Sequence, residues 1–108
     1  MSRDKNSIHP VLRAVMQVIP GLAETLGDGI EVLVNDFSHP EDAMLAIAGN
    51  ITGRQPGAPL SDMVLKRLRQ GTLKEDMINY YSRTPDGREL RSSTILVRDG
   101  DGQVLGCL

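Results

Sequence analysis

The sequence predicts an α+β domain with a single five-stranded antiparallel sheet and helices on one face of that sheet. The strongest observation is at 80–108, where three strand-like runs are joined by Asp-Gly turns at Asp86-Gly87 and at 99–102. Asp-Gly between β-rich runs is a strong hairpin signal, because glycine adopts positive φ at little cost. The second observation is the order upstream, a helical segment, two strand-like runs and a helical middle. This order is typical of helices packed on an antiparallel sheet.

The N-terminal helix is expected to begin at His9-Pro10, because proline suits the first turn. An apolar stripe recurs in it at helical spacing and consists of Leu12, Val15, Met16 and Ile19. Pro20 is expected to interrupt the helix, so that 21–26 forms a second short piece ending at Gly27. The stripe either packs on the domain's own sheet or forms a dimer interface with the same helix of a second protomer. Residues 1–19 are thus predicted to be a flexible start and an amphipathic helix.

The middle of the chain predicts two strands, a loop and a helix. Residues 30–35 are rich in β-branched side chains, and 43–51 are expected to pair with them as a hairpin. Residues 52–59 hold two glycines and two prolines and predict an irregular loop. A helix capped by Ser61 or Asp62 should run to Gln70 and stop at Gly71. Residues 72–79 are a short helix or a connection, and strands are expected at 80–84, 88–98 and from 103 onward.

Composition excludes several classes of protein. The length of 108 residues predicts one domain, and the net charge of −2 argues against this domain gripping a nucleic-acid backbone by itself. Cys107 is the one cysteine, so no disulfide forms within the chain, and a reducing, cytoplasmic compartment fits. No apolar run approaches the ~20 residues of a membrane span.

The loop at 50–57 is a candidate ligand site. Its glycines expose backbone N–H groups, and Arg54 offers a bidentate fork for a carboxylate or phosphate. Asn50 and Thr52 are placed to orient such a ligand. The alternative is structural: the glycines and prolines shape a turn, and these two side chains bond the local backbone.

A second candidate lies in the strand expected at 88–98. Ser92 and Thr94 alternate onto one face of that strand. Small hydroxyls on an inner face leave room for a small molecule and hydrogen-bond it. Ordinary cross-strand pairing of hydroxyls is the alternative.

Catalysis is not expected from this sequence. A nucleophile needs an adjacent base, yet His9, His39 and Cys107 belong to no recognisable catalytic motif. Their spacing also fits no metal site, so we expect neither a metal nor a cofactor.

Three segments carry a family resemblance: EVLVNDFS at 31–38, MLAIAGNITGRQPGAPLSDM at 44–63 and YYSRTPDGRELRSSTILVRDGDGQVLG at 80–106. Together they resemble the YheO-like PAS domain of bacterial transcriptional regulators, over residues 20–108. The resemblance implies a PAS-like sheet whose last strand, 103–108, lies between the first strand and 91–98. It also implies a cytoplasmic regulator in which this sensor precedes a C-terminal helix-turn-helix domain, absent from this chain, that contacts DNA. Asn35 stands where relatives often carry histidine.

These observations lead to one functional prediction and one alternative. The prediction is a non-enzymatic sensory domain that binds a small polar metabolite and forms a homodimer. The candidate ligand-binding residues are Asn35, Asn50, Thr52, Arg54, Ser92 and Thr94. The candidate dimer residues are those of the N-terminal stripe. The alternative is a PAS module without a ligand that serves only dimerisation and interaction.

Overall fold

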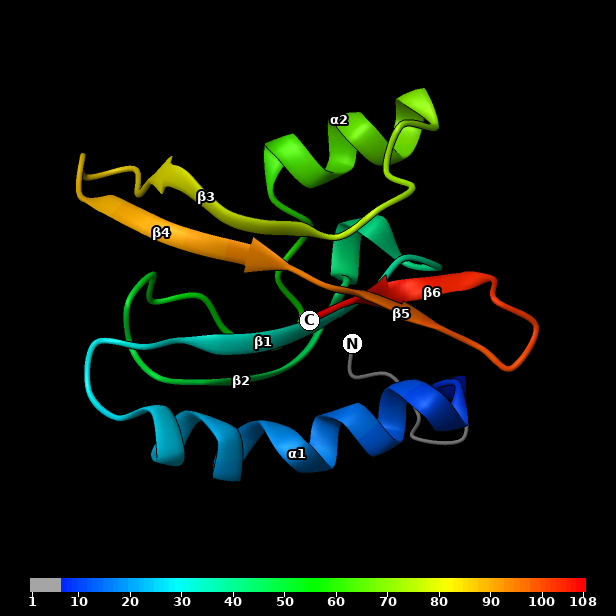
Figure 1. The fold of residues 1–108 in the computed structure, drawn as a ribbon, viewed down its shortest axis with the longest axis horizontal. Helices are drawn as coiled ribbons and strands as arrows, with labels where there is room; N and C mark the ends of the chain where they lie inside the picture. The colour runs from blue at the N-terminus through cyan, green and yellow to red at the C-terminus, as the bar shows by residue number, and fades with distance from the viewer. Residues whose placement is uncertain (1–6) are drawn as a thin grey trace.

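The computed structural model describes residues 7–108 and confirms the predicted α+β class and PAS-like arrangement (Figure 1). The helices are α1 (Pro10–Leu26), the short 3-10 helix η2 (Pro40–Asp42) and α2 (Asp62–Gln70). The strands are β1 (Val32–Asp36), β2 (Met44–Ala48), β3 (Met77–Arg83), β4 (Glu89–Thr94), β5 (Leu96–Arg98) and β6 (Val104–Cys107). The predicted flexible start covers residues 1–7, and positions 1–6 of it lie outside the described residues.

The main sheet has four strands in the order β2-β1-β6-β5, and all its pairings are antiparallel. Strand β6 therefore lies between β1 and β5, as predicted for the last strand. Its centre is Gly106, where an added Cβ would overlap the carbonyl oxygen of Asn35. A glycine is needed there because the two backbones approach too closely for a side chain.

The predicted single five-stranded sheet is not what forms. The run expected at 88–98 divides at Ile95 into β4, which pairs with β3, and β5, which pairs with β6. One extended segment thus changes partners along its length. The result is six strands in two sheets, because the β3-β4 hairpin forms a separate two-stranded sheet beyond the four-stranded one.

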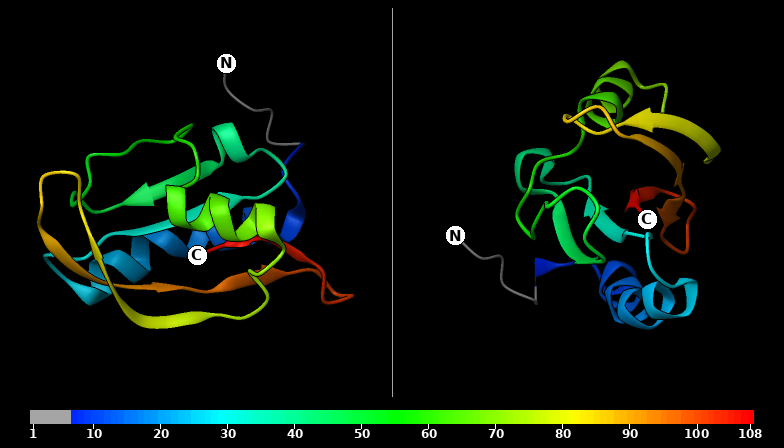
Figure 2. Two further views of the ribbon diagram at one scale, coloured as in Figure 1. Left: turned by 90° about the horizontal axis from the view of Figure 1, so that it is seen from above. Right: turned by 90° about the vertical axis from the view of Figure 1, so that its left-hand side faces the viewer.

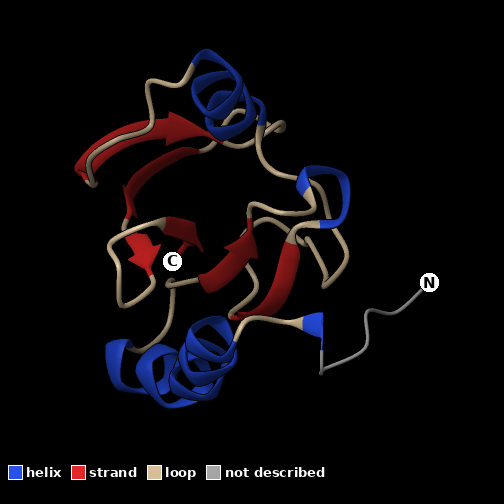
Figure 3. Ribbon diagram, turned by 90° about the vertical axis from the view of Figure 1, so that its right-hand side faces the viewer, coloured by secondary structure: helices blue, strands red, loops and turns tan. Residues whose placement is uncertain are grey.

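The prediction that the helices lie on one face is wrong. Helix α1 packs against β1 and β2 on one face, whereas α2 and the hairpin lie on the other (Figures 2 and 3). The cluster under α1 consists of Ile8, Leu12, Ile19 and Val34. The cluster under α2 consists of Ala43, Leu60, Val64, Leu73, Leu96 and Cys107. The continuous apolar run of β1 indicates this arrangement, because a strand covered on both faces does not alternate with polar residues. We call the α2 side of the sheet the inner face.

Helix α1 runs unbroken through Pro20, contrary to the predicted interruption, and the predicted boundary at 19 and 20 lies inside it. Pro20 is exposed, so water can bond the carbonyl that loses its N–H donor. The turns on both sides are held by packing, because Leu12 and Ile19 are buried against the sheet. The helix begins as expected: the His9 Nδ1 atom accepts from the Val11 N–H at 3.1 Å.

Helix α2 has both predicted caps. The Ser61 hydroxyl accepts from the Val64 N–H at 3.4 Å, and Gly71 ends the helix in the left-handed conformation with φ of 69°. The segment from Gly71 to β3 is a connection. Within residues 7–108, no helix has the length and apolar character that crossing a bilayer requires.

Candidate ligand-binding site

The loop after β2 is tied down by a carboxylate of the chain itself. Glu31 accepts from the Ile51 N–H at 2.8 Å and from the Thr52 N–H at 2.9 Å, both through Oε2. Its Oε1 atom accepts from the Thr52 hydroxyl at 2.9 Å. The sequence predicts loop N–H groups of this kind as donors to an anionic ligand. In the structure they donate to Glu31 instead, so Thr52 has the structural role of the alternative prediction.

Arg54 also bonds within its loop. Its guanidinium donates to the Pro59 carbonyl, and its N–H donates to the Thr52 hydroxyl. Arg88, at the tip of the β3-β4 hairpin, donates to the Ile51 carbonyl at 2.6 Å. This contact joins the hairpin to the loop that Glu31 holds.

The hairpin carries two pairs of hydroxyls on the side that turns toward the α2 cluster. The Tyr80 and Thr94 hydroxyl oxygens are 2.7 Å apart, and those of Ser82 and Ser92 are 2.9 Å apart. Ser92 and Thr94 therefore share one face, as alternation predicted. Thr94 is buried and Ser92 is half-buried. Both make the cross-strand bonds of the structural alternative, and both still line the interior.

Asn35 lies on the inner face, and its buried side-chain amide is only partly hydrogen-bonded. The residue is 5% exposed, and its Nδ2 donates to the Cys107 Sγ at 3.7 Å. Its Oδ1 is buried and has no hydrogen-bond partner among the described residues. Exchanging the two ends of the amide would let the thiol donate to Oδ1 and leave Nδ2 unpaired. One end of the amide thus lacks a partner in either orientation, at a cost of about 1–3 kcal/mol.

Part of the inner face is left uncovered by the α2 cluster. Leu33 and Ile47 pair across β1 and β2, are half-buried, and belong to neither core cluster. The hairpin supplies the half-buried Tyr80, Ser82 and Ser92 on the same side. We call these five residues the inner surface. Asn35 follows Leu33 by two residues on β1 and so borders it. The inner surface combines apolar side chains with a few polar groups, which is the usual composition of a small-molecule site.

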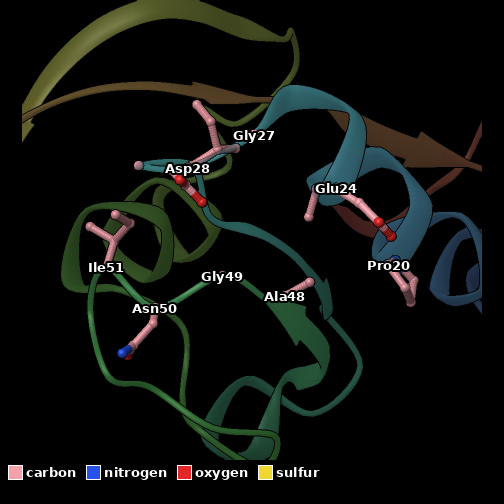
Figure 4. Close-up of a pocket in the computed structure, with 11 residues that line it drawn as sticks. Pro20, Glu24, Gly27, Asp28, Ala48, Gly49, Asn50 and Ile51 are labelled. Atoms are coloured by element: carbon pink, nitrogen blue, oxygen red, sulfur yellow. The ribbon is translucent and has the colours of Figure 1, made fainter.

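Asn50 lies apart from the other predicted residues. It lines a hollow of about 520 Å³ between the end of α1 and the loop after β2 (Figure 4). Glu24 and Asp28 line the same hollow, and both are exposed to solvent. A second hollow of about 380 Å³ lies by the start of α1 and includes His9 and Asp36. The structure therefore brings Asn35, Ser92 and Thr94 to the inner side, and leaves Asn50 on another surface.

The predicted dimer stripe faces inward. Leu12 and Ile19 are buried in the cluster under α1, and Val15 and Met16 are half-buried against it. The first two side chains are therefore unavailable to a second protomer. The stripe serves the first of its two predicted roles, packing on the domain's own sheet.

Cys107 does not have the character of a nucleophile. Burial raises the pKa of its thiol to about 11, and the hydrogen bond from Asn35 opposes this rise only in part. The thiol is therefore protonated at neutral pH, whereas catalytic cysteines need the thiolate. Within residues 7–108, no three side chains of the metal-binding types gather in one place.

Sequence reasoning missed Glu31 and Tyr80. Glu31 stood inside a predicted strand, and no local signal marks a carboxylate that reaches a loop 20 residues away. Tyr80 could have been found, because a tyrosine opposite hydroxyl residues in an expected hairpin predicts a cross-strand bond.

The fold is that of a PAS-type domain, a class of regulatory or sensory domains. Residues 6–108 match the model of the YheO-like PAS domain, so the chain belongs to that family. In Escherichia coli (strain K12), the "Uncharacterized protein YheO" is 29% identical over 101 residues, covering 91% of this chain and 42% of that protein. An "Uncharacterized protein" of Haemophilus influenzae is 25% identical over 99 residues, covering 91% and 45%. The chain spans less than half the length of these curated relatives. No solved structure matches it.

Proposed function

We propose that this chain is the sensory domain of a bacterial, cytoplasmic transcription regulator and binds a small polar metabolite on the inner surface. DNA binding belongs, in this proposal, to a helix-turn-helix segment of the longer protein. Membership of a regulatory PAS family supports the class. The observation that carries the ligand is the inner surface itself, where two hydroxyl pairs and two half-buried apolar side chains lie on the same side of the sheets.

A route for the signal runs from this surface into the central strand. Asn35 borders the surface and donates to Cys107, the last residue of β6. A ligand that bonds the Asn35 amide would change its contact with Cys107 and hence favour one position of β6. A ligand biases only states that it binds with different affinity, so the unpaired amide is the point where such a bias would arise.

The experiment is a thermal-shift screen of this chain against neutral, anionic and cationic metabolites. Binding raises the apparent stability by mass action, so a ligand at about 100 times its dissociation constant adds about 2.7 kcal/mol. We expect at least one compound to raise the melting temperature. Any hit should lose its effect in Ser92→Ala but keep it in Ser93→Ala, whose side chain is on the exposed face of the same strand. A screen without hits would remove the metabolite from the proposal.

The alternative function is dimerisation without a ligand, and one observation favours it. The solvent side of α1 is uncharged over two turns, at Ala14, Val18 and Gly21, and Val18 is 58% exposed. A Cβ at Gly21 would meet nothing within 4 Å, so packing inside the chain does not require glycine there. Glycine in a helix costs about 1 kcal/mol relative to alanine, but it lets another backbone approach. We propose this side, rather than the buried stripe, as the contact with a second protomer.

Sedimentation equilibrium of Val18→Glu tests that contact. We expect the variant to be monomeric at concentrations where the parent chain dimerises, because the glutamate would be buried without a partner. Ile78→Glu is the matched control, since Ile78 is 56% exposed on the hairpin. Equal association of both variants would place any dimer contact elsewhere.

A further inference from the structure

We infer that the ligand of the inner surface is uncharged and forms a hydrogen bond with the unpaired end of the buried Asn35 amide, as an amide or a polyol does. This inference rests on the proposed function and narrows it, because it excludes carboxylates, phosphates and ammonium ions as the recognised group.

Among residues 7–108, an anion would find no cation to pair with at the inner surface. Arg54 is bonded to the Pro59 carbonyl, and Arg88 is divided between the Ile51 carbonyl and the Asp86 carboxylate. Arg83 and Arg91 are exposed and alternate with the inward hydroxyls, so they belong to the opposite side of the hairpin. Removing an unpaired carboxylate or phosphate from water is strongly unfavourable, so such a ligand would bind poorly here.

A cation would be no better placed. The Glu31 carboxylate accepts three hydrogen bonds from the loop after β2. Asp76 accepts from the Leu96 N–H at 2.8 Å, which fixes the start of β5. Each carboxylate therefore already holds a structural element through hydrogen bonds. The acidic hollow beside Asn50 lies on a different surface and belongs to exposed side chains.

The polar groups that remain are neutral. One end of the buried Asn35 amide, Oδ1 in the structure, has no partner among the described residues, so a neutral group from outside them can satisfy it. In each hydroxyl pair one O–H donates to the other, which leaves the second proton and several lone pairs free. A ligand that both donates and accepts satisfies this set, as an amide or a polyol does. Leu33 and Ile47 supply the apolar floor for its carbon skeleton.

Matched pairs of probes test the inference by ¹⁵N–¹H correlation spectroscopy of the 108-residue chain. The pairs are propionamide with propionate, gluconamide with gluconate, and xylitol with xylonate. We expect at least one neutral probe to shift the Asn35 side-chain NH₂ signal in a saturable way, and its charged counterpart to bind at least tenfold more weakly.

Two variants assign the contact. Asn35→Leu should weaken the neutral probe at least tenfold, whereas Asn50→Leu, the same change on the exposed loop, should leave its affinity within twofold. If Asn35→Leu does not fold, Thr94→Val serves instead and should weaken binding several-fold, with Ser93→Ala as its control.

The outcomes separate this inference from the proposed function. If all hits in the thermal-shift screen are anions or cations, the inference of an uncharged ligand is wrong, but the proposed sensory function stands. Neutral binding that survives Asn35→Leu and Thr94→Val, or that is lost in Asn50→Leu, would also overturn it. If neither the screen nor the probes show binding, both the proposed metabolite binding and the inferred neutral chemistry of the ligand are wrong.

Discussion

The two faces of the sheet are built from different chemistry. Beneath α1 the contacts are aliphatic, and Leu12, Ile19 and Val34 are almost completely buried. The inner face instead carries an amide, two hydroxyl pairs and half-buried apolar side chains beside a second core cluster. We therefore expect the α1 face to contribute most to the stability of the domain, and we propose the inner face as the one that binds a ligand.

The largest expected effect is a loss of stability when a buried side chain of the α1 face is shortened. Leu12→Ala should lower the free energy of unfolding by about 2–5 kcal/mol, because it leaves a cavity in a closely packed cluster. Val18→Ala, on the exposed side of the same helix, should change it by less than about 0.5 kcal/mol. Urea unfolding measures both. A loss below about 1 kcal/mol for Leu12→Ala would show that the α1 face does not dominate stability.

The next effect concerns pH on the inner face. Burial raises the pKa of Cys107 from 9.0 to about 11, so the folded state holds the thiol proton more tightly than the unfolded state. The stabilisation that this tighter proton binding gives the folded state is fully present below pH 9.0 and is lost as the pH rises toward about 11. The loss should be on the order of 2–3 kcal/mol.

Urea unfolding of the parent chain and of Cys107→Ala across this pH window isolates the thiol, since both proteins share their other titrating groups. The parent should lose more stability than the variant. Parallel curves for the two proteins would contradict the raised pKa.

A smaller effect is expected at the loop that Glu31 holds. Glu31→Gln replaces one acceptor oxygen by a donor and removes the charge that three hydrogen bonds share. We expect the free energy of unfolding to fall by about 1–2 kcal/mol and hydrogen exchange at the Ile51 and Thr52 amides to become faster. Glu24→Gln, an exposed carboxylate, should leave these exchange rates unchanged. Unaltered exchange in Glu31→Gln would mean that the loop is ordered by other contacts.

The smallest effect has the opposite sign. Asn35→Leu should raise the free energy of unfolding by about 1 kcal/mol, because it removes a buried amide with one unpaired end and keeps the branched shape of the side chain. Thermal unfolding without ligand measures this change. A stability gain combined with lost ligand binding is the trade-off expected of a recognition residue. A destabilised Asn35→Leu would indicate that the amide is structural.

The sequence predicted those features that depend on neighbouring residues. Ser61 and Gly71 cap α2, and the Asp-Gly turns form hairpins, because caps and turns are set by a few consecutive side chains. The positions of Asn35, Ser92 and Thr94 on the inner side follow from alternation once the strands are known.

The features that escaped prediction depend on distant parts of the chain. Packing of α1 on the sheet carries the helix through Pro20, against local propensity. The change of partner at Ile95 depends on β3 and β6, and neither is marked in the sequence of the strand itself. The partner of Glu31 lies across a hairpin, so local patterns around the residue do not show that its carboxylate is already bonded.

The central place of β6 has a consequence for how the protein is made. Asn35 and Cys107 are 72 positions apart, so β1 pairs with β6 only after the segment between them has been made. During synthesis, the inward edges of β1 and β5 remain unpaired until β6 leaves the ribosome and inserts between them. Such edges are templates for association with other chains, so this domain has the most need of a chaperone just before its last strand emerges.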